Sequence, residues 1–328
     1  MRGLSLNDPQ AEAGAAPALS ILPDLSILIV AYNSAAFIDD CIGSVIEHTA
    51  PGSYEILLVD NGTDGTAAKV AADFPMVQII PGRGNIGFGQ ANNLLAEHAR
   101  ASYLLLLNPD TQLADPAIDS LLAFARSQPA AAWGGLTTFP DGSLDGGNFL
   151  TIPTLGGIAR DVVGLGGRGR ERDRLEQLAV PERVDVLCGG FMLVSREAWD
   201  AVGGFDPSFL LYSEEIDLFT RLRAAGHEVW LCPGSRIIHD IGSGNAYTPA
   251  RMRYTQTGLM HYARRHWSTP MAKIAGVAYW LIAARRWVIS VLLSRVSASH
   301  AARMKAHTPI VVNPAIWWRG YEGKTSLD

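Results

Sequence analysis

Two acidic segments lie where carboxylates commonly do chemistry. Asn108-Pro109-Asp110 follows the apolar residues 103–107, and oxygen ligands at the end of a buried strand can hold a hard cation such as Mg²⁺ or Mn²⁺. Such a cation would bridge the two phosphates of a nucleotide diphosphate and stabilise the charge that develops as the bond to the sugar breaks. The same tripeptide is a common type I turn, and alone it favours that simpler interpretation.

The second acidic segment is residues 212–217, in which Glu214, Glu215 and Asp217 open a predicted helix. Carboxylates in the first turn of a helix are stabilised by its dipole, so a capping role is the simpler interpretation. A carboxylate is also the base needed to activate a hydroxyl for attack on an anomeric carbon. The spacing does not select one of the three.

His239 ends a predicted strand and precedes Asp240 and Gly242-Ser243-Gly244, which we expect to form a mobile loop. A lone histidine is usually structural, but imidazole can complete a Mn²⁺ or Mg²⁺ shell made otherwise of oxygens. The segment GRGNIG at residues 82–87 matches the GxGxxG pattern of dinucleotide-binding proteins. It follows the third predicted strand and not the first, so a dinucleotide-binding fold is disfavoured.

Alternating strands and helices would position these residues. Apolar runs predict buried strands at residues 25–31, 55–59, 77–80 and 103–107, separated by helices at 37–48, 66–74 and 89–100. This alternation predicts an α/β fold with a doubly wound, mostly parallel sheet, in which ligands bind beyond the carboxyl ends of the strands. The polar residues predicted at those ends are Tyr32, Asn33, Asp60, Asn61, Asn108 and Asp110.

The sequence after Ala132 is less regular. Residues 140–175 are rich in Gly, Asp and Arg and predict a long mobile loop, which is typical of an active-site lid. Beyond it we expect strand character at 184–194, interrupted by Cys188-Gly189-Gly190, further strands at 228–232 and 236–239, and helices at 195–202 and 216–225.

The last 78 residues differ from the rest in charge. Residues 251–328 contain 12 Lys and Arg against 2 Asp and Glu, whereas the remaining residues contain 15 and 30. Two apolar runs, 274–284 and 287–293, flank Arg285-Arg286, and five of the eight tryptophans lie here. Neither run is long enough to span a bilayer, so we expect a segment in the interface of an anionic membrane rather than one packed over the main domain. Nucleic acid is not expected, because the basic residues match no nucleic-acid motif.

The remaining composition favours a globular cytosolic protein. The chain is 48% hydrophobic and 18% charged, which excludes disordered and disulfide-rich classes. The three cysteines are odd in number and lack CxxC spacing, so we expect reduced thiols. Residues 1–23 have no long apolar run and predict a flexible tail without a signal peptide.

Taken together, these motifs resemble glycosyltransferase family 2, in the branch of bacterial rhamnosyltransferases. The segments that carry the resemblance run in order through residues 24–245: LSILIVAYNS, EILLVDNGTDGT, GNIGFGQANN, LLLLNPDT, CGGFMLVSREAW, GGFDPSFLLYSEEIDLFTRLRAAG and IIHDIGSG. The resemblance implies a GT-A fold, a Mg²⁺ or Mn²⁺ cofactor and an inverting single displacement. It implies a nucleotide-sugar-binding half at residues 24–135, an acceptor and catalytic half at 136–250, and a helical, membrane-associating extension at 251–328.

The resemblance also implies roles for single residues. Asp110 would be the firm metal ligand, because Asn108 replaces the first Asp of the DxD motif, and His239 would be the late metal or diphosphate ligand. Glu214-Glu215 match the family's Glu-Asp pair, whose second member is the base. Glu215 is one methylene longer than Asp, so the base stays open among Glu215, Glu214 and Asp217. The implied nucleotide-sugar-binding residues are Ala31, Tyr32, Asn33, Asp60, Asn61, Asn85, Gly87, Asn92 and Asn108.

The implied activity is the transfer of a sugar, with dTDP-L-rhamnose as the expected donor, to a polyprenyl-diphosphate-linked or glycan acceptor in bacterial surface polysaccharide synthesis. We expect a cytoplasmic enzyme, peripheral on the inner face of the cell membrane. The alternative is a non-catalytic relic of the fold that binds a nucleotide sugar or glycan. The intact Asp110, His239 and acidic cluster favour the enzyme.

Overall fold

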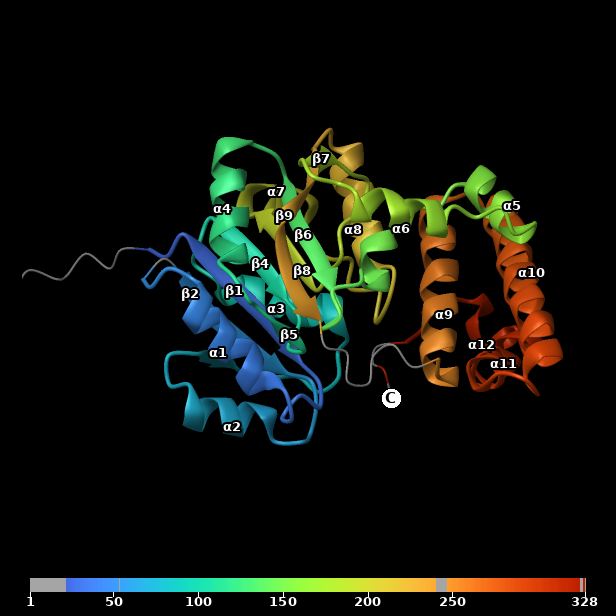
Figure 1. Ribbon diagram of the computed structural model, residues 1–328, viewed down its shortest axis with the longest axis horizontal. Helices are drawn as coiled ribbons and strands as arrows, with labels where there is room; N and C mark the ends of the chain where they lie inside the picture. Colours follow the sequence, from blue (N-terminus) through green and yellow to red (C-terminus); the bar gives the residue numbers. More distant parts are fainter. Residues whose placement is uncertain (1–21, 53, 240–246, 325–326, 328) are drawn as a thin grey trace, which may run out of the picture.

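The computed structural model describes residues 22–52, 54–239, 247–324 and 327 (Figure 1). The predicted tail at 1–23 therefore lies almost entirely outside the described residues, as do Asp240 and Gly242-Ser243-Gly244. Figure 1 shows an α/β lobe that contains the sheet, and beside it a helical lobe built mainly from the end of the chain.

The described residues form a nine-stranded sheet in the order β3-β2-β1-β4-β8-β6-β9-β5, with β7 also paired to β9. Strands β1 to β4 are parallel, β8 is antiparallel to β4 and β6, and β6 is parallel to β9. The sheet is therefore mixed in its second half and follows the α/β prediction in its first. The bounds are β1 Leu25–Ala31, β2 Tyr54–Asp60, β3 Gln78–Ile80, β4 Tyr103–Leu107, β5 Thr111–Gln112, β6 Ala132–Thr138, β7 Glu182–Arg183, β8 Phe191–Ser195 and β9 Val229–His239.

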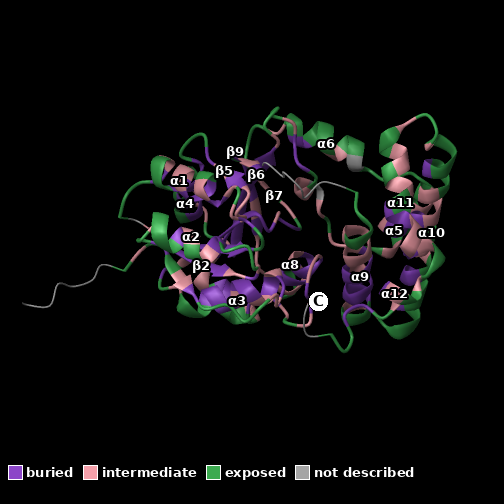
Figure 2. Cartoon of the chain, turned by 90° about the horizontal axis from the view of Figure 1, so that it is seen from below, coloured by how far each residue is buried: buried purple, intermediate pink, exposed green. Residues whose placement is uncertain are grey.

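Helices cover both faces of the sheet, because its central strands are apolar on both sides. In β1, Ile27 and Ile29 contribute to one core, while Leu28 and Val30 contribute to the other. Figure 2 shows the resulting buried layers. One face carries α1 (Ile38–His48), α2 (Thr66–Asp73) and α4 (Ala117–Ser127), and the other carries α3 (Phe88–His98), α7 (Arg196–Val202) and α8 (Glu214–Ala224).

Three expectations for the second half were wrong. Residues 140–175 contain the 3₁₀ helix η1 (Gly146–Phe149), α5 (Leu155–Val162) and α6 (Arg168–Glu176) instead of a single long loop. Of the strand predicted at 184–194, residues 184–187 form no strand, and β8 begins after the expected interruption at Cys188-Gly189-Gly190. The two strands expected at 228–232 and 236–239 are one strand, β9, which passes through Pro233-Gly234 without ending.

The helical lobe consists of α9 (Pro249–His266), α10 (Thr269–Leu293), α11 (Ala298–Val312) and α12 (Ala315–Trp318), with α5 packed against α10. Helix α10 continues through Arg285-Arg286 and joins the two apolar runs in a single helix. The helix is long and apolar enough to cross a membrane by length and composition, with a mean hydropathy of 1.4 over its most apolar 18 residues, of which 22% are buried.

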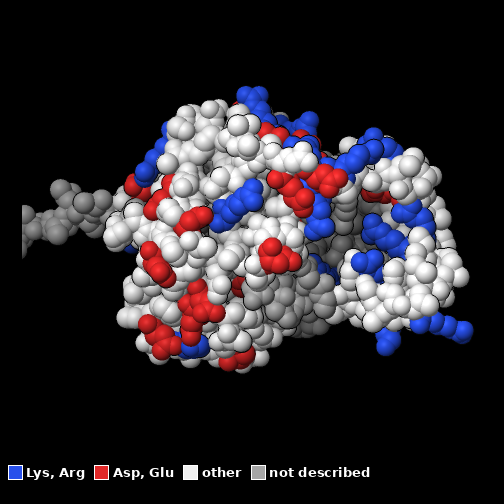
Figure 3. Space-filling view, in the orientation of Figure 1, with Lys and Arg blue, Asp and Glu red and all other residues white. Residues whose placement is uncertain are grey.

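Trp317 is buried in this lobe, and the other four tryptophans from Trp267 onward are half-buried. The indole nitrogens of Trp280, Trp287 and Trp317 donate to Val311 O, Thr308 Oγ1 and Ile310 O within the lobe. The charge asymmetry is visible in Figure 3, where acidic groups spread over the α/β lobe and basic groups predominate on the helical lobe.

Candidate active site

His239, the last residue of β9, lies at the centre of a polar cluster at the edge of the sheet. Pairing of β5 with β9 places Thr111 opposite His239, so the turn at 108–110 folds over the end of β9. The Nε2 atom of His239 is 3.1 Å from Asp110 Oδ1 and 3.3 Å from Asn108 Nδ2. The structure thus brings together the three residues that the sequence assigned to metal and diphosphate binding.

Asp145 is a fourth member of this cluster, which the sequence did not reveal. Its Oδ2 lies 2.7 Å from His239 Nδ1, and it is 3% exposed. Burial alone would lower the imidazole pKa, but the hydrogen bonds and charges of Asp110 and Asp145 outweigh it and raise the pKa of His239 to about 9. Burial alone would raise the Asp145 pKa, but His239 holds it below its usual value. The only sequence signal is an Asp beside two glycines in the region taken for a loop.

The donor set of this cluster fits a hard divalent cation. Asp110 offers a carboxylate that keeps 21% of its side-chain surface exposed, and Asn108 adds an amide oxygen. His239 adds an imidazole once the ion displaces the ring proton that its raised pKa retains. Within the described ranges, no three or more His, Cys, Asp or Glu side chains converge as a metal cage. A partial protein shell is what Mg²⁺ and Mn²⁺ sites need when substrate phosphates and water supply the remaining ligands.

A turn of two glycines joins this cluster to the acidic helix α8. A Cβ on Gly189 would be 2.7 Å from Glu215 Oε1, and a Cβ on Gly190 would be 2.9 Å from Asn108 Nδ2. Any side chain at either position would therefore displace one of these groups. The turn lets Glu215 and Asn108 approach from two sides of the same short segment, a role that the sequence did not indicate beyond the two adjacent glycines.

The three carboxylates of α8 have different surroundings. Glu215 is half-buried, and burial raises its pKa. Glu214 is 2% exposed, its Oε2 has no partner among the described residues, and burial followed by the charge of Glu215 raises its pKa well above the usual value. Asp217 is 1% exposed and is held by Arg221 and His266 at 2.7 and 2.8 Å. The geometry places Glu215 against Gly189 beside the cluster, leaves Glu214 buried near Gly89 of α3, and gives Asp217 a structural ion-pair network.

The ends of β1 and β2 meet as expected for a nucleotide site. Ala31 is paired with Asp60 across the two strands, and the exposed Tyr32 follows it. Asn33 has a φ of +52°, and its amide lies so near Gly62 that a Cβ there would be 2.5 Å from Asn33 N. Both Asp60 carboxylate oxygens accept backbone hydrogen bonds, from Gly62 N and Ala67 N, so Asp60 fixes the loop that enters α2.

The segment before α3 completes this edge. Asn61 donates to Gly87 O at 3.1 Å, which links the β2 end to the start of α3. The carbonyl of Asn85 accepts from Leu327 N at the end of the chain. Asn92 does not reach this edge, because it is 1% exposed and donates to Phe88 O within its own helix.

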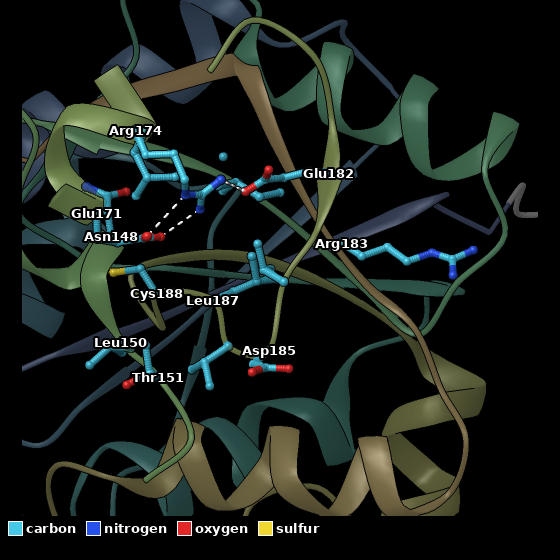
Figure 4. Close-up of a pocket in the computed structure, with 15 residues that line it drawn as sticks. Asn148, Leu150, Thr151, Glu171, Arg174, Glu182, Arg183, Asp185, Leu187 and Cys188 are labelled. Atoms are coloured by element: carbon cyan, nitrogen blue, oxygen red, sulfur yellow. Dashed lines mark hydrogen bonds and ion pairs between the residues drawn. The ribbon is translucent and has the colours of Figure 1, made fainter. Parts of the chain in front are cut away.

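A cavity of about 390 Å³ lies beside the Gly189-Gly190 turn (Figure 4). Cys188, directly before Gly189, forms part of its wall, so the cavity is two residues from the carbonyl that Asn108 N contacts. Its charged lining comprises Glu171, Arg174, Glu182, Arg183 and Asp185. Figure 4 shows Arg174 between Glu171 and Glu182, which it contacts at 2.6 and 2.5 Å.

The sheet, its two helical layers and the polar edge define a GT-A fold. Among solved structures it is similar to the mannosyltransferase PcManGT from Pyrobaculum calidifontis in complex with GDP-Man and Mn²⁺, with a TM-score of 0.56 and 14% identity over 94% of this chain and 87% of that one. GalNAc-T7 with UDP, GalNAc and Mn²⁺ gives 0.52 and 18% over 67% of this chain and 43% of the other.

The model of glycosyl transferase family 2 matches residues 26–203, and the chain belongs to this family of glycosyltransferases. It is 30% identical over 283 residues to the N-acetylglucosaminyl-diphospho-decaprenol L-rhamnosyltransferase of Mycobacterium tuberculosis (strain CDC 1551 / Oshkosh), covering 81% of this chain and 89% of the relative. It is 26% identical over 224 residues to the rhamnosyltransferase WbbL of Escherichia coli (strain K12), covering 65% and 82%. The predicted family, its rhamnosyltransferase-like branch and the fold are confirmed.

Proposed function

We propose that this glycosyltransferase moves L-rhamnose from dTDP-L-rhamnose to a sugar on a polyprenyl diphosphate, with inversion at the anomeric carbon. The observation that carries the proposal is the Gly189-Gly190 turn, which holds Glu215 and the Asn108–His239 cluster on its two sides. The names of the mycobacterial and Escherichia coli relatives support the donor sugar, and that of the mycobacterial relative supports the acceptor.

Asp110 and His239, with Asn108 beside them, would hold a Mg²⁺ or Mn²⁺ ion that neutralises charge on the leaving nucleotide diphosphate. The strand-end residues from Ala31 to Asn61 and the Gly87 loop would hold the nucleoside. Asp145 would orient the His239 ring through its contact with Nδ1. These side chains bind and orient the donor.

Glu215 is the proposed base. It accepts the proton of the acceptor hydroxyl while the hydroxyl oxygen bonds to the anomeric carbon and the bond from that carbon to the diphosphate oxygen breaks. The nucleoside diphosphate leaves on the opposite side, which inverts the configuration. Burial raises the Glu215 pKa, which moves it toward neutral pH, where a general base works best.

The cavity beside Cys188 is the proposed subsite for the neutral sugar of the acceptor, within the acceptor half at 136–250. Three carboxylates and two guanidinium groups line it, so its formal charge is negative and a diphosphate there would be repelled. Carboxylate oxygens accept hydrogen bonds from sugar hydroxyls, and the arginines donate to ring and hydroxyl oxygens. A sugar in this cavity would have its diphosphate and lipid outside it.

The lipid would stay in the bilayer while the enzyme docks on its inner leaflet through α10. Ala272, Ala275, Tyr279 and Ile282 of this helix face the lobe, and an apolar stripe faces outward. The stripe consists of the exposed residues Ile274, Val277, Leu281, Val288 and Leu292, with exposed Lys273, Arg286 and Arg295 beside it. An apolar face with basic residues suits the surface of an anionic membrane.

The test is a panel of nucleotide sugars incubated with Mg²⁺ or Mn²⁺ and with polyprenyl diphosphates that carry or lack N-acetylglucosamine. We expect transfer from dTDP-L-rhamnose to the sugar-bearing lipid only, and a product linkage of inverted configuration by nuclear magnetic resonance. Transfer of a different sugar would contradict the donor, and transfer to the bare lipid would contradict the acceptor. Tight donor binding without transfer or hydrolysis would contradict the whole proposal.

A further inference from the structure

The backbone directly before the acidic helix α8 has an unusual conformation. Tyr212 and Ser213 have φ angles of +64° and +72°, and neither is glycine. Two successive left-handed residues with side chains persist only where the surroundings enforce them. Ser213 is the N-cap of α8, yet its side chain makes no capping hydrogen bond. The first residues of the helix that this turn orients are Glu214 and Glu215.

Contacts from other parts of the chain hold three successive carbonyls of this turn, residues 210–213. On the donor side, Gly87 approaches Leu210 O, where a Cβ would be only 2.0 Å away. From the helical lobe, the Tyr321 hydroxyl donates to Leu211 O. Also from that lobe, Gly258 of α9 approaches Tyr212 O so closely that a Cβ would be 2.3 Å away.

The helical lobe also contacts the first turn of α8, at Asp217. His266, the last residue of α9, lies 2.8 Å from Asp217 Oδ1. Tyr321 is itself fixed, because it is 2% exposed and its backbone N donates to His261 Nδ1 at 3.2 Å. Binding to a membrane does not require the helical lobe to contact the 210–213 turn. These contacts therefore indicate a further role for the lobe, at the turn that sets the position of Glu215.

We propose that the helical lobe positions the catalytic base, with Tyr321 and Gly258 as positioning residues that hold the 210–213 turn. Without these contacts the turn relaxes from its left-handed conformation, and the start of α8 moves Glu215 away from Gly189 and the acceptor hydroxyl. This inference rests on the proposed transfer reaction. Donor binding changes much less than transfer, because the turn meets the nucleotide site only through Leu210 and Gly87, whereas Tyr321 and Gly258 contact Leu211 and Tyr212.

The first test compares Tyr321→Phe with Tyr279→Phe in the full chain. Both tyrosines are buried in the helical lobe, but the Tyr279 hydroxyl has no partner among the described residues. We expect Tyr321→Phe to lower kcat about tenfold or more, since small misplacements of a catalytic group can cost up to about a hundredfold. The KM for the donor and the affinity for the nucleoside diphosphate should stay within about twofold of the wild-type values, a much smaller change than the loss in kcat. Tyr279→Phe should leave kcat unchanged.

The second test replaces Gly258 by Ala, with Gly43→Ala as its control. Both glycines lie within helices, and alanine is the better helix former, but a Cβ at Gly43 meets nothing within 4 Å. Assays run well below the unfolding temperatures separate loss of positioning from loss of folding. We expect Gly258→Ala to lower kcat, with more rapid amide hydrogen exchange at residues 210–217, and Gly43→Ala to behave as the wild type.

Equal kcat values for Tyr321→Phe and Tyr279→Phe, in a wild-type enzyme that transfers sugar, would overturn the positioning role and leave the proposed function intact. A parallel loss of donor affinity in Tyr321→Phe would also overturn it, because a general disturbance of the fold would then explain the effect. Failure of the wild type to transfer any sugar would overturn the proposed function itself.

Discussion

Asp145 and His239 form a buried pair, with the carboxylate Oδ2 2.7 Å from the imidazole Nδ1, on the opposite side of the ring from Asp110. The two residues are far apart in sequence, and η1 and β9 bring them together. The contact fixes the ring so that Nε2 faces Asn108 and Asp110. Partners of this kind orient ligand histidines and raise their basicity in metal sites.

Asp145→Asn should weaken metal-dependent nucleotide binding by about 10- to 100-fold, the usual effect of removing an outer partner of a ligand histidine. Titration calorimetry with nucleoside diphosphate and Mn²⁺ measures it. Asp141→Asn is the control, because that exposed carboxylate accepts hydrogen bonds from Ser143 of its own loop and is not part of the His239 cluster. Equal affinities for the two variants would show that Asp145 does not support His239.

Asp110→Ala should abolish activity and the metal-dependent part of nucleotide binding without unfolding the protein, since Asp110 lies at a strand end and is partly exposed. His239→Ala should weaken the same binding less. Activity assays with graded Mn²⁺ and circular dichroism test both statements. Full wild-type activity in excess chelator would contradict the proposed metal requirement.

Glu215→Gln should keep donor binding and lose transfer by a factor of about 10²–10⁴, as for removal of a general base. Because burial raises its pKa, Glu215 becomes protonated at a higher pH than an ordinary Glu, so the acid limb of kcat/KM lies above the usual 4.5. Asp217→Asn should instead lower the unfolding temperature, because it disturbs the pairs with Arg221 and His266. An active Glu215→Gln with a dead but folded Asp217→Asn would reassign the base.

Glu214→Gln should stabilise the protein in a pH-dependent way. The folded pKa of Glu214 is raised above its unfolded value, so the folded state binds the proton more tightly, and stability falls as pH rises from about 4.5 through the folded pKa. Glutamine has no such loss. Thermal unfolding of the two proteins should differ least at pH 4 and increasingly toward pH 8; a gap that is constant with pH would show that the carboxyl is not the cause.

Thr151→Trp should fill the cavity from its exposed rim and raise the KM for the acceptor about tenfold, the scale of one lost contact of 1.4 kcal/mol, with unchanged hydrolysis of the donor by water. Glu47→Trp adds the same bulk to an exposed side chain of α1 and should change neither quantity. An unaltered acceptor KM for Thr151→Trp would contradict the acceptor subsite.

Val288→Glu combined with Leu292→Glu should abolish flotation of the protein with anionic liposomes at low salt, because both exposed side chains belong to the outward stripe of α10. Met76→Glu, at a similarly exposed apolar position of the α/β lobe, should float like the wild type. If the wild type, the double variant and Met76→Glu all fail to float, α10 does not bind such a surface.

The first half of the fold could be predicted because strands buried on both faces are continuous apolar runs. The observed β1 has the predicted bounds, and β2 and β4 differ from them by at most one residue at each end. The second half could not, because local pattern conflicts with tertiary structure there. Helix α6 has the sequence RGRERDRLE, with a single apolar residue, Leu175, and β9 contains Pro233-Gly234.

The residues of the candidate site also differ in whether the local sequence could predict them. Asn108, Asp110 and His239 could be expected at one edge of the sheet because they lie at or just after the ends of recognisable strands, and the family resemblance implied their roles. Asp145 and the Gly189-Gly190 turn could not, since their roles arise from contacts between segments distant in sequence. Periodicity marked the start of α8 but not which carboxylate faces the site, because that depends on what packs around each side chain.

The packing of α5 against α10 has a consequence for biosynthesis. Ile158 is buried in the same hydrophobic cluster as Ala275 and Tyr279, although α5 precedes α10 by more than a hundred residues. At about 5–20 residues per second, translation leaves the apolar side of α5 without its partner for several seconds. The nascent chain therefore passes through a stage in which the α/β lobe has emerged from the ribosome while the apolar side of α5 is still exposed to solvent. A ribosome stalled before α10, or a gene truncated there, would yield a product that needs chaperones to stay in solution.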